Sequence, residues 1–168
     1  MAALLREGHG LIERDRSVLI VIDVQDYFLG KLPLDVRGPL VQRMAWLMRV
    51  ARALDIPIIA TAEDVARDGP LTLALADALP AGAIVHDKLI FGLTDQAPIL
   101  AAVQATGRTT AVLIGLETDV CVAHSALGLA QHGIRPVVIE DATHSPPPHH
   151  DHGIRRLSEA GVVIQSTK

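Results

Sequence analysis

Six short apolar runs, rich in β-branched residues and separated by segments with helical spacing, limit this chain to few folds. The runs are residues 18–22, 56–60, 83–85, 109–114, 136–139 and 162–164. Continuous runs without polar alternation are typical of strands buried on both faces, as in a parallel sheet. Parallel strands joined through helices connect by right-handed crossovers. The pattern therefore predicts an α/β fold, a three-layer sandwich with a six-stranded parallel sheet.

Helices are expected between the runs. Residues 39–54 carry apolar side chains at helical spacing, and Pro39 suits a first turn. Asp95 is placed to cap a helix over 96–105. Further helices are predicted over 71–79, 120–132 and 150–160.

Composition predicts one globular domain, residues 1–168, with 49% hydrophobic and 20% charged residues. The formal charge of −4 and the lack of a basic run argue against a nucleic-acid partner. No apolar stretch has signal-peptide or membrane-spanning character, which argues against a membrane partner. The single cysteine cannot form an internal disulfide, so a cytoplasmic location is expected.

Three polar residues follow different strands of the predicted sheet. In the doubly wound, Rossmann-like order 3-2-1-4-5-6, strands one and four meet at the switch point, where ligands bind at the carboxyl ends. Asp23 ends strand one, Cys121 lies just past strand four, and Lys88 follows strand three at the same edge. Topology therefore predicts that these three side chains share one crevice.

Taken singly, each residue has a simpler interpretation: Asp23 as a cap, Lys88 as a surface lysine, and Cys121 as a packed thiol. Their coincidence at one edge favours an activated nucleophile instead. A helix N-terminus and a neighbouring cation lower a thiol pKa from about 8.5, and Lys88 is that cation. Asp23 then takes the thiol proton and returns it to a leaving amine.

The surrounding segments resemble a known family. They read VLIVIDVQDYF at 18–28, HDKLIF at 86–91 and GLETDVCVAHSALGLAQHGIRPVVIEDAT at 115–143. In these segments the chain resembles the isochorismatase-like cysteine hydrolases, which include nicotinamidases and N-carbamoylsarcosine amidohydrolase. Its pattern is most similar to that of the less characterised isochorismatase-domain proteins.

The resemblance implies a catalytic triad of Asp23, Lys88 and Cys121, and an oxyanion hole from the backbone N–H groups of Glu117 and Cys121. It also implies a cis peptide bond before Glu117 and a homodimer or larger homo-oligomer, in which Trp46 would suit an interface. The implied reaction is hydrolysis of a C–N bond in a small molecule, through a thioester on the cysteine.

The chain departs from its metal-containing relatives, which carry Asp-x-His after strand two. The corresponding stretch is TAEDV at 61–65, with Glu63 and Val65. Because the imidazole ligand is missing, we predict no metal and no cofactor, and a nicotinamidase is disfavoured. Glu117 stands where many relatives have a small apolar residue, which suggests that its side chain favours a cationic or amide-bearing substrate.

Rings are scarce, yet Tyr27, Phe28 and Phe91 each lie within five positions of a proposed catalytic residue. They are candidate walls of a substrate pocket, or plugs of the core. Gln25 and Glu63 are candidate polar groups of the same pocket, with Gln25 as a loop brace in the alternative.

Two further interpretations stay open. The histidine-rich segment 144–152 is expected to be a proline-stiffened loop with solvated imidazoles rather than a metal site. A thiol of lowered pKa also suits a redox sensor, or a family scaffold with little hydrolase activity.

Overall fold

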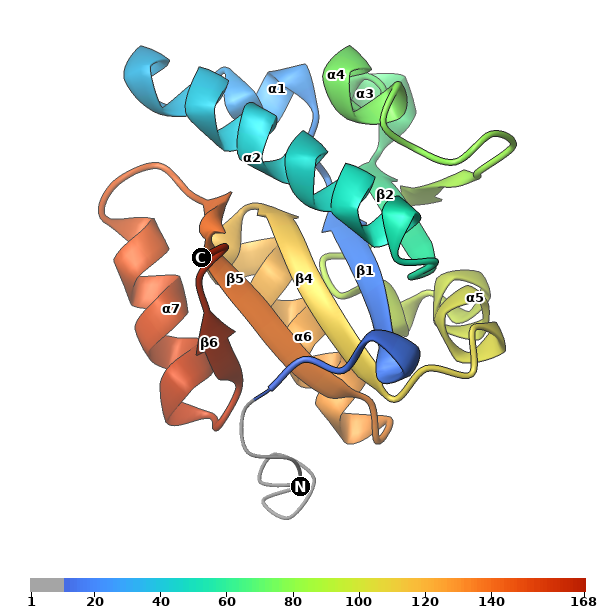
Figure 1. The fold of residues 1–168 in the computed structure, drawn as a ribbon. Helices are drawn as coiled ribbons and strands as arrows, with labels where there is room; N and C mark the ends of the chain where they lie inside the picture. Colours follow the sequence, from blue (N-terminus) through green and yellow to red (C-terminus); the bar gives the residue numbers. More distant parts are fainter. Residues whose placement is uncertain (1–10) are drawn as a thin grey trace.

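The sheet has six parallel strands in the order β3-β2-β1-β4-β5-β6, as predicted (Figure 1). The structure, a computed structural model, describes residues 11–168. The predicted domain also includes residues 1–10, which lie outside the described residues, so its boundary stays a prediction. The strands are β1 (Ser17–Ile22), β2 (Ile58–Glu63), β3 (Val85–Lys88), β4 (Thr110–Leu116), β5 (Arg135–His144) and β6 (Val163–Gln165).

Helices cover both faces of this sheet, which makes the three layers (Figure 1). One face packs against α1 (Asp26–Leu29), α2 (Leu34–Ala53) and α4 (Leu73–Ala76). The other packs against α5 (Ala97–Ala105), α6 (Ala123–Gln131) and α7 (His149–Glu159). Shorter helical turns are η1 (Arg14–Arg16), α3 (Val65–Asp68), η2 (Leu93–Asp95) and η3 (Thr118–Val122). Within the described residues, no helix is long and apolar enough to span a membrane.

The central strand β1 is buried on both faces, which explains why its sequence is apolar without interruption. Leu19 and Val21 join the core on the α2 side, with Met44. Ile20 and Ile22 join the core on the α6 side. All of these side chains are at most 4% exposed, and each such burial contributes roughly 1.5–3 kcal/mol. Apolar residues on both faces thus anchor the strand that carries Asp23 at its end.

The starts of α2 and α5 differ from the prediction. Helix α2 begins at Leu34 rather than Pro39, because Pro33 already fixes the N-cap; Pro39 lies inside the helix. Helix α5 begins at Ala97, and Asp95 makes no capping hydrogen bond because it ends the preceding turn η2.

The ends of β2 and β3 extend further than the apolar runs suggested. Strand β2 continues through Glu63, and β3 ends on Lys88, its partner in the register. Polar residues at the strand ends resemble loop in sequence, but here they continue the sheet toward the crevice. The sheet itself therefore places Glu63 beside Lys88.

At Gly115, β4 leaves no room for a side chain against the backbone of β1. The φ of Gly115 is +134°, and an added Cβ would lie 2.1 Å from the backbone oxygen of Ile22. The β4–β5 register also shifts between Leu113 and Gly115. Only glycine tolerates both the angle and the approach, so this residue sets the spacing between the strand ends that carry Asp23 and the cysteine turn.

Candidate active site

Asp23 ends β1 in a left-handed backbone conformation, with φ of 50°, and is fully buried. Thr61 Oγ1 donates a hydrogen bond of 2.7 Å to its Oδ1, and Lys88 Nζ lies 2.9 Å from its Oδ2. Burial raises the pKa of Asp23 above its ordinary value, against the opposing effect of Lys88. A non-glycine residue held in this conformation and buried with its charge is typical of a functional position.

Lys88 is also fully buried, so the surface-lysine interpretation is excluded. Its ammonium lies 3.3 Å from Glu63 Oε2, donates a 2.9 Å hydrogen bond to the carbonyl of Ile90, and lies 3.6 Å from Cys121 Sγ. Burial alone would lower the pKa of Lys88, but Asp23, Cys121 and Glu63 together raise it. These neighbours therefore favour the charged ammonium at the centre of the site.

Cys121 lies in the π-helical turn η3, which leads into α6. The expected first α-helical turn is thus a wider turn, and α6 itself begins two residues later. The thiol is 4% exposed and donates a 3.0 Å hydrogen bond to Glu63 Oε2. Burial, then the Asp23 carboxylate, raises the pKa of Cys121, and Lys88 offsets this only in part. The expected lowering of this pKa is therefore wrong, because burial favours the neutral thiol.

Glu63 contacts the thiol, the ammonium and, at 3.6 Å, the guanidinium of Arg67. Its backbone is fixed by Gln25, whose Nε2 donates to the carbonyls of Glu63 and Gly69, at 2.8 and 2.7 Å. The Oε1 of Gln25 accepts from the Glu63 N–H at 2.7 Å. These contacts fit the bracing alternative for Gln25, and they place Glu63 among the catalytic candidates.

Asp23, Glu63 and Cys121 have the donor types of a metal site, with ligand atoms within 4.8 Å of one another. Lys88, however, contacts all three groups. A divalent cation at this point would require displacement or deprotonation of a lysine whose pKa is raised. The donor set therefore fits an ammonium better than a metal ion, and we predict no metal.

The three candidate pocket aromatics have different surroundings. Phe28 is 8% exposed and belongs to the core, whereas Tyr27 and Phe91 are both 52% exposed. Phe91 faces His124, with ring centroids 5.9 Å apart. Phe28 fits the plug alternative, while the role of Tyr27 and Phe91 as pocket walls stays a prediction.

The turn proposed to supply the oxyanion hole is held by the histidine-rich segment. The peptide bond Leu116–Glu117 is cis, as the resemblance implied. Ser145 Oγ donates a 2.6 Å hydrogen bond to Asp119 Oδ1, and Thr118 Oγ1 and His150 Nδ1 form one of 2.9 Å. The turn is thereby tied to the start of α7.

The expected loop of solvated imidazoles is consequently wrong in part. His149 and His150 open helix α7, and His144 ends strand β5. His144 and His150 are half-buried and stack with centroids 4.8 Å apart. Each imidazole has a hydrogen-bond partner within the fold. The partner of His150 is Thr118 Oγ1, and that of His144 Nδ1 is the carbonyl of Ser145, at 2.6 Å.

Sequence reasoning missed Lys31, whose Nζ lies 3.3 Å from Glu117 Oε1. It also missed Thr61 and the Ser145–Asp119 contact. The scarcity of lysine, with three in the chain, was a usable signal for Lys31. The other contacts carry no signature, since they depend on how loops far apart in sequence meet.

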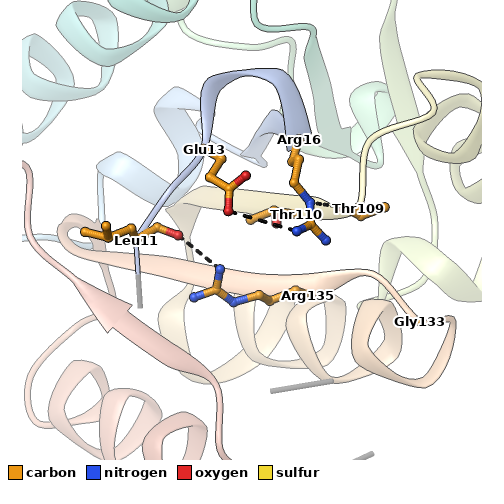
Figure 2. Close-up of a pocket in the computed structure, with 7 residues that line it drawn as sticks. All are labelled: Leu11, Glu13, Arg16, Thr109, Thr110, Gly133 and Arg135. Carbon is orange, nitrogen blue, oxygen red and sulfur yellow. Dashed lines mark hydrogen bonds and ion pairs between the residues drawn. The ribbon is translucent and has the colours of Figure 1, made fainter. Parts of the chain in front are cut away.

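A separate cavity of about 100 Å³ lies at the amino-terminal ends of the strands, opposite the ends that carry the catalytic candidates (Figure 2). Arg16, which ends the turn η1 before β1, and Arg135, the first residue of β5, both line it. Arg16 donates to Thr109 Oγ1 at 3.1 Å, and Arg135 to the carbonyl of Leu11 at 3.1 Å. None of the predicted catalytic residues lines this cavity.

Comparison with solved structures supports the fold. YcaC from Pseudomonas aeruginosa, solved with hexane-2,5-diol and covalent acrylamide, superimposes with a TM-score of 0.85 at 24% identity, over 95% of this chain and 80% of that one. YcaC from Escherichia coli, described as an octameric hydrolase of unknown specificity, has a TM-score of 0.85 at 22% identity, over 95% and 79%.

Sequence comparison gives the family. Isochorismatase family protein 2A of Dictyostelium discoideum is 27% identical over 166 residues, which are 95% of this chain and 82% of that protein. The isochorismatase domain model matches residues 17–168, which include every residue of the site. This chain therefore belongs to the isochorismatase-domain family and is an isochorismatase-like hydrolase.

Proposed function

We propose that this protein hydrolyses a C–N bond, of an amide or a carbamoyl group in a small molecule, through a thioester on Cys121. The observation that carries the proposal is the buried ammonium of Lys88, 2.9 Å from Asp23 and 3.6 Å from the Cys121 sulfur. A nucleophile, a cation and a carboxylate in contact form the minimal set for covalent acyl transfer.

In the first half of the reaction, the sulfur attacks the carbonyl carbon and its proton passes to a carboxylate of the site. Because burial keeps the thiol protonated, this transfer accompanies the attack and does not precede it. Backbone N–H groups of Glu117 and Cys121 are the proposed donors to the oxyanion. Collapse breaks the C–N bond, and the departing nitrogen takes a proton, which the triad assignment gives to Asp23.

In the second half, water attacks the thioester carbon, the C–S bond breaks, and the sulfur recovers a proton. The acid is released and the cysteine is restored, so no oxidant or cofactor enters the balance. Lys88 stabilises the negative charge throughout, because its ammonium remains in contact with both carboxylates and the sulfur.

Substrate recognition is proposed for the groups around the thiol. Tyr27 and Phe91 are exposed at 52% and follow the catalytic strands β1 and β3, so they are available to cover an apolar or planar group. The polar side chains of Glu63 and Gln25 already form hydrogen bonds within the protein. This supports a small substrate that carries few polar groups. The substrate class is therefore set by the carbonyl group that Cys121 attacks and by the exposed rings of Tyr27 and Phe91, which together form an aromatic rim.

The redox-sensor alternative has less support. Sensor thiols are accessible and of lowered pKa, whereas Cys121 is 4% exposed and its pKa is raised by burial. A scaffold that keeps its triad without turnover is distinguished from a hydrolase by the experiment below.

We also propose a cytoplasmic homo-oligomer. The support is the octameric state described for YcaC from Escherichia coli and the 46% exposure of Trp46 on α2. The single cysteine fits a reducing compartment. Light scattering of the purified chain measures the assembly, and a monomer at micromolar concentration would contradict it.

The direct test is covalent trapping. The purified protein is incubated with primary amides, carbamoyl compounds and hydroxamates, and its intact mass is followed in time. We expect a transient acyl adduct on one or more compounds, absent in Cys121→Ala. If the wild type gives neither adduct nor product across the three classes, the scaffold interpretation replaces the hydrolase.

A further inference from the structure

Glu63 makes the hydrogen bond that the triad assignment gives to Asp23. The Cys121 thiol donates to Glu63 Oε2 at 3.0 Å, whereas Asp23 interacts with the thiol while also bonded to Thr61 and paired with Lys88. Asp23 Oδ1 accepts from Thr61 at 2.7 Å, and Oδ2 faces Lys88 at 2.9 Å. Glu63 is thus the carboxylate within hydrogen-bond distance of the sulfur that is not also the 2.9 Å partner of Lys88.

The surroundings of Glu63 are built to hold it in that position. Its side chain is 12% exposed and its backbone is bonded on both sides by Gln25. Its other oxygen faces Arg67 at 3.6 Å, so Oε2 is the oxygen turned to the sulfur. A base that must act during attack needs this hydrogen-bond geometry.

We propose that Glu63 is a fourth catalytic residue, which accepts the Cys121 proton as the sulfur attacks, while Asp23 stays ionised as the counter-ion of Lys88. The inference rests on the proposed function. In the step, the S–H bond breaks, an O–H bond forms on Glu63, and the sulfur pair forms the S–C bond. The carbonyl π pair moves to oxygen. Glu63 then returns the proton to the departing nitrogen.

Charge supports this division of labour. With a neutral thiol, the site holds two carboxylates and one ammonium, a net charge of −1. Release of the thiol proton to water would leave −2 in a buried site, which is costly. Transfer to Glu63 keeps the charge at −1, and the remaining Asp23–Lys88 pair is unchanged. An internal acceptor is therefore favoured over solvent.

The test uses iodoacetamide and needs no hydrolase substrate. Since Cys121 is the sole cysteine of the chain, intact mass reports its alkylation directly. If an internal base takes the thiol proton, the alkylation rate stays constant from the pH at which the carboxylate ionises up to the pH at which the thiol ionises. Without such a base, the rate rises tenfold per pH unit until the thiol ionises.

For the wild type we expect a level rate between about pH 6 and 8. Glu63→Gln should abolish the level region and reduce the rate at pH 6 about 10²-fold, in line with general-base effects. Asp23→Asn should retain the level region, and Glu63→Asp should restore it in part. Asp64→Asn is the matched control, because Asp64 pairs with Arg67 and its loss should leave the profile unchanged.

Several results would overturn the proposal. One is a wild-type rate that rises tenfold per pH unit throughout. Another is a level region that survives in Glu63→Gln, or one that Asp23→Asn also loses. Thermal unfolding of each variant identifies those that fail to fold, and Glu63→Asp then carries the comparison. Failure of the hydrolase proposal is separate, since it appears as missing acyl adducts whatever the alkylation profile shows.

Discussion

Lys31 and Glu117 form an ion pair beside the proposed oxyanion turn, with Nζ 3.3 Å from Oε1. The ammonium also lies over the rings of Tyr27 and Phe28, 4.6 and 4.5 Å from their centroids. A cation of the chain itself thus meets the Glu117 carboxylate. The hypothesis that Glu117 favours a cationic substrate is weakened, because its charge is already compensated.

Removal of Lys31 should expose that charge. In Lys31→Met, we expect Cys121 to react about 3- to 10-fold faster with a cationic than with an anionic methanethiosulfonate reagent, relative to the wild-type ratio. This corresponds to about 1 kcal/mol for a partly exposed charge. Lys168→Met removes the same charge at the chain end and should leave the ratio unchanged. An unaltered ratio in Lys31→Met would mean that the charge of Glu117 does not affect which reagent reaches the Cys121 thiol.

Lys88→Met should destabilise the fold in a pH-dependent way. The substitution leaves the carboxylates of Asp23 and Glu63 without their buried cation, at a cost of about 3–5 kcal/mol near neutral pH. Burial raises the folded pKa of Asp23, and without the ammonium nothing of that strength opposes it, so this pKa lies above the unfolded value near 4. The loss should therefore be small below pH 4 and grow as the pH rises. Urea unfolding at several pH values measures it, and a pH-independent loss would contradict this account.

Acid should weaken the contact between α7 and the catalytic turn. Burial and the neighbouring His144 lower the pKa of His150 below its ordinary value of 6.5, although Asp151 and Asp119 oppose this. A lowered folded pKa means that protonation favours the unfolded chain. Stability should thus be unaffected above about pH 6.5 and fall as the pH drops below it.

Two histidine variants separate this effect from general acid unfolding. His150→Asn should reduce the slope of stability against pH between about 5 and 6.5, whereas His152→Asn, at an exposed position of the same helix, should keep the wild-type slope. Equal slopes in the two variants would remove His150 from the explanation. Thermal unfolding across this pH range is the measurement.

Gly115→Ala should be among the most damaging single substitutions. Its methyl group would meet the Ile22 backbone oxygen at 2.1 Å and occupy a φ of +134°. We expect a loss of at least about 4 kcal/mol, or no soluble protein. Gly38→Ala is the control, because a Cβ there meets nothing within 4 Å. Its effect should stay within about 1 kcal/mol, since the gain in helix propensity is opposed by the following proline.

The sequence was sufficient for the sheet order and for the meeting of Asp23, Lys88 and Cys121. Apolar runs mark the strands, and right-handed parallel topology then brings their carboxyl ends to one edge. The sequence did not predict where the strands with polar ends stop. Strand β2 continues to Glu63, and the polar side chains of Thr61 and Glu63 contact Asp23 and Cys121, so their polarity reflects the site and not a loop.

The protonation state of Cys121 was also beyond the sequence. The helix and Lys88 were visible as influences that lower its pKa, but the degree of burial and the Glu63 hydrogen bond were not. These depend on a few ångströms of packing. The same holds for the Lys31–Glu117 pair, which joins positions 86 residues apart.

The backbone contact at Gly115 has a consequence for how this protein can change over evolutionary time. The spacing of the two strand ends is fixed by main-chain atoms, so core side chains can drift without shifting the reacting groups. The rim, with Tyr27 and Phe91 exposed, is then free to be remodelled. Such a molecule can acquire a new ligand preference by surface substitution alone, while its chemistry stays the same.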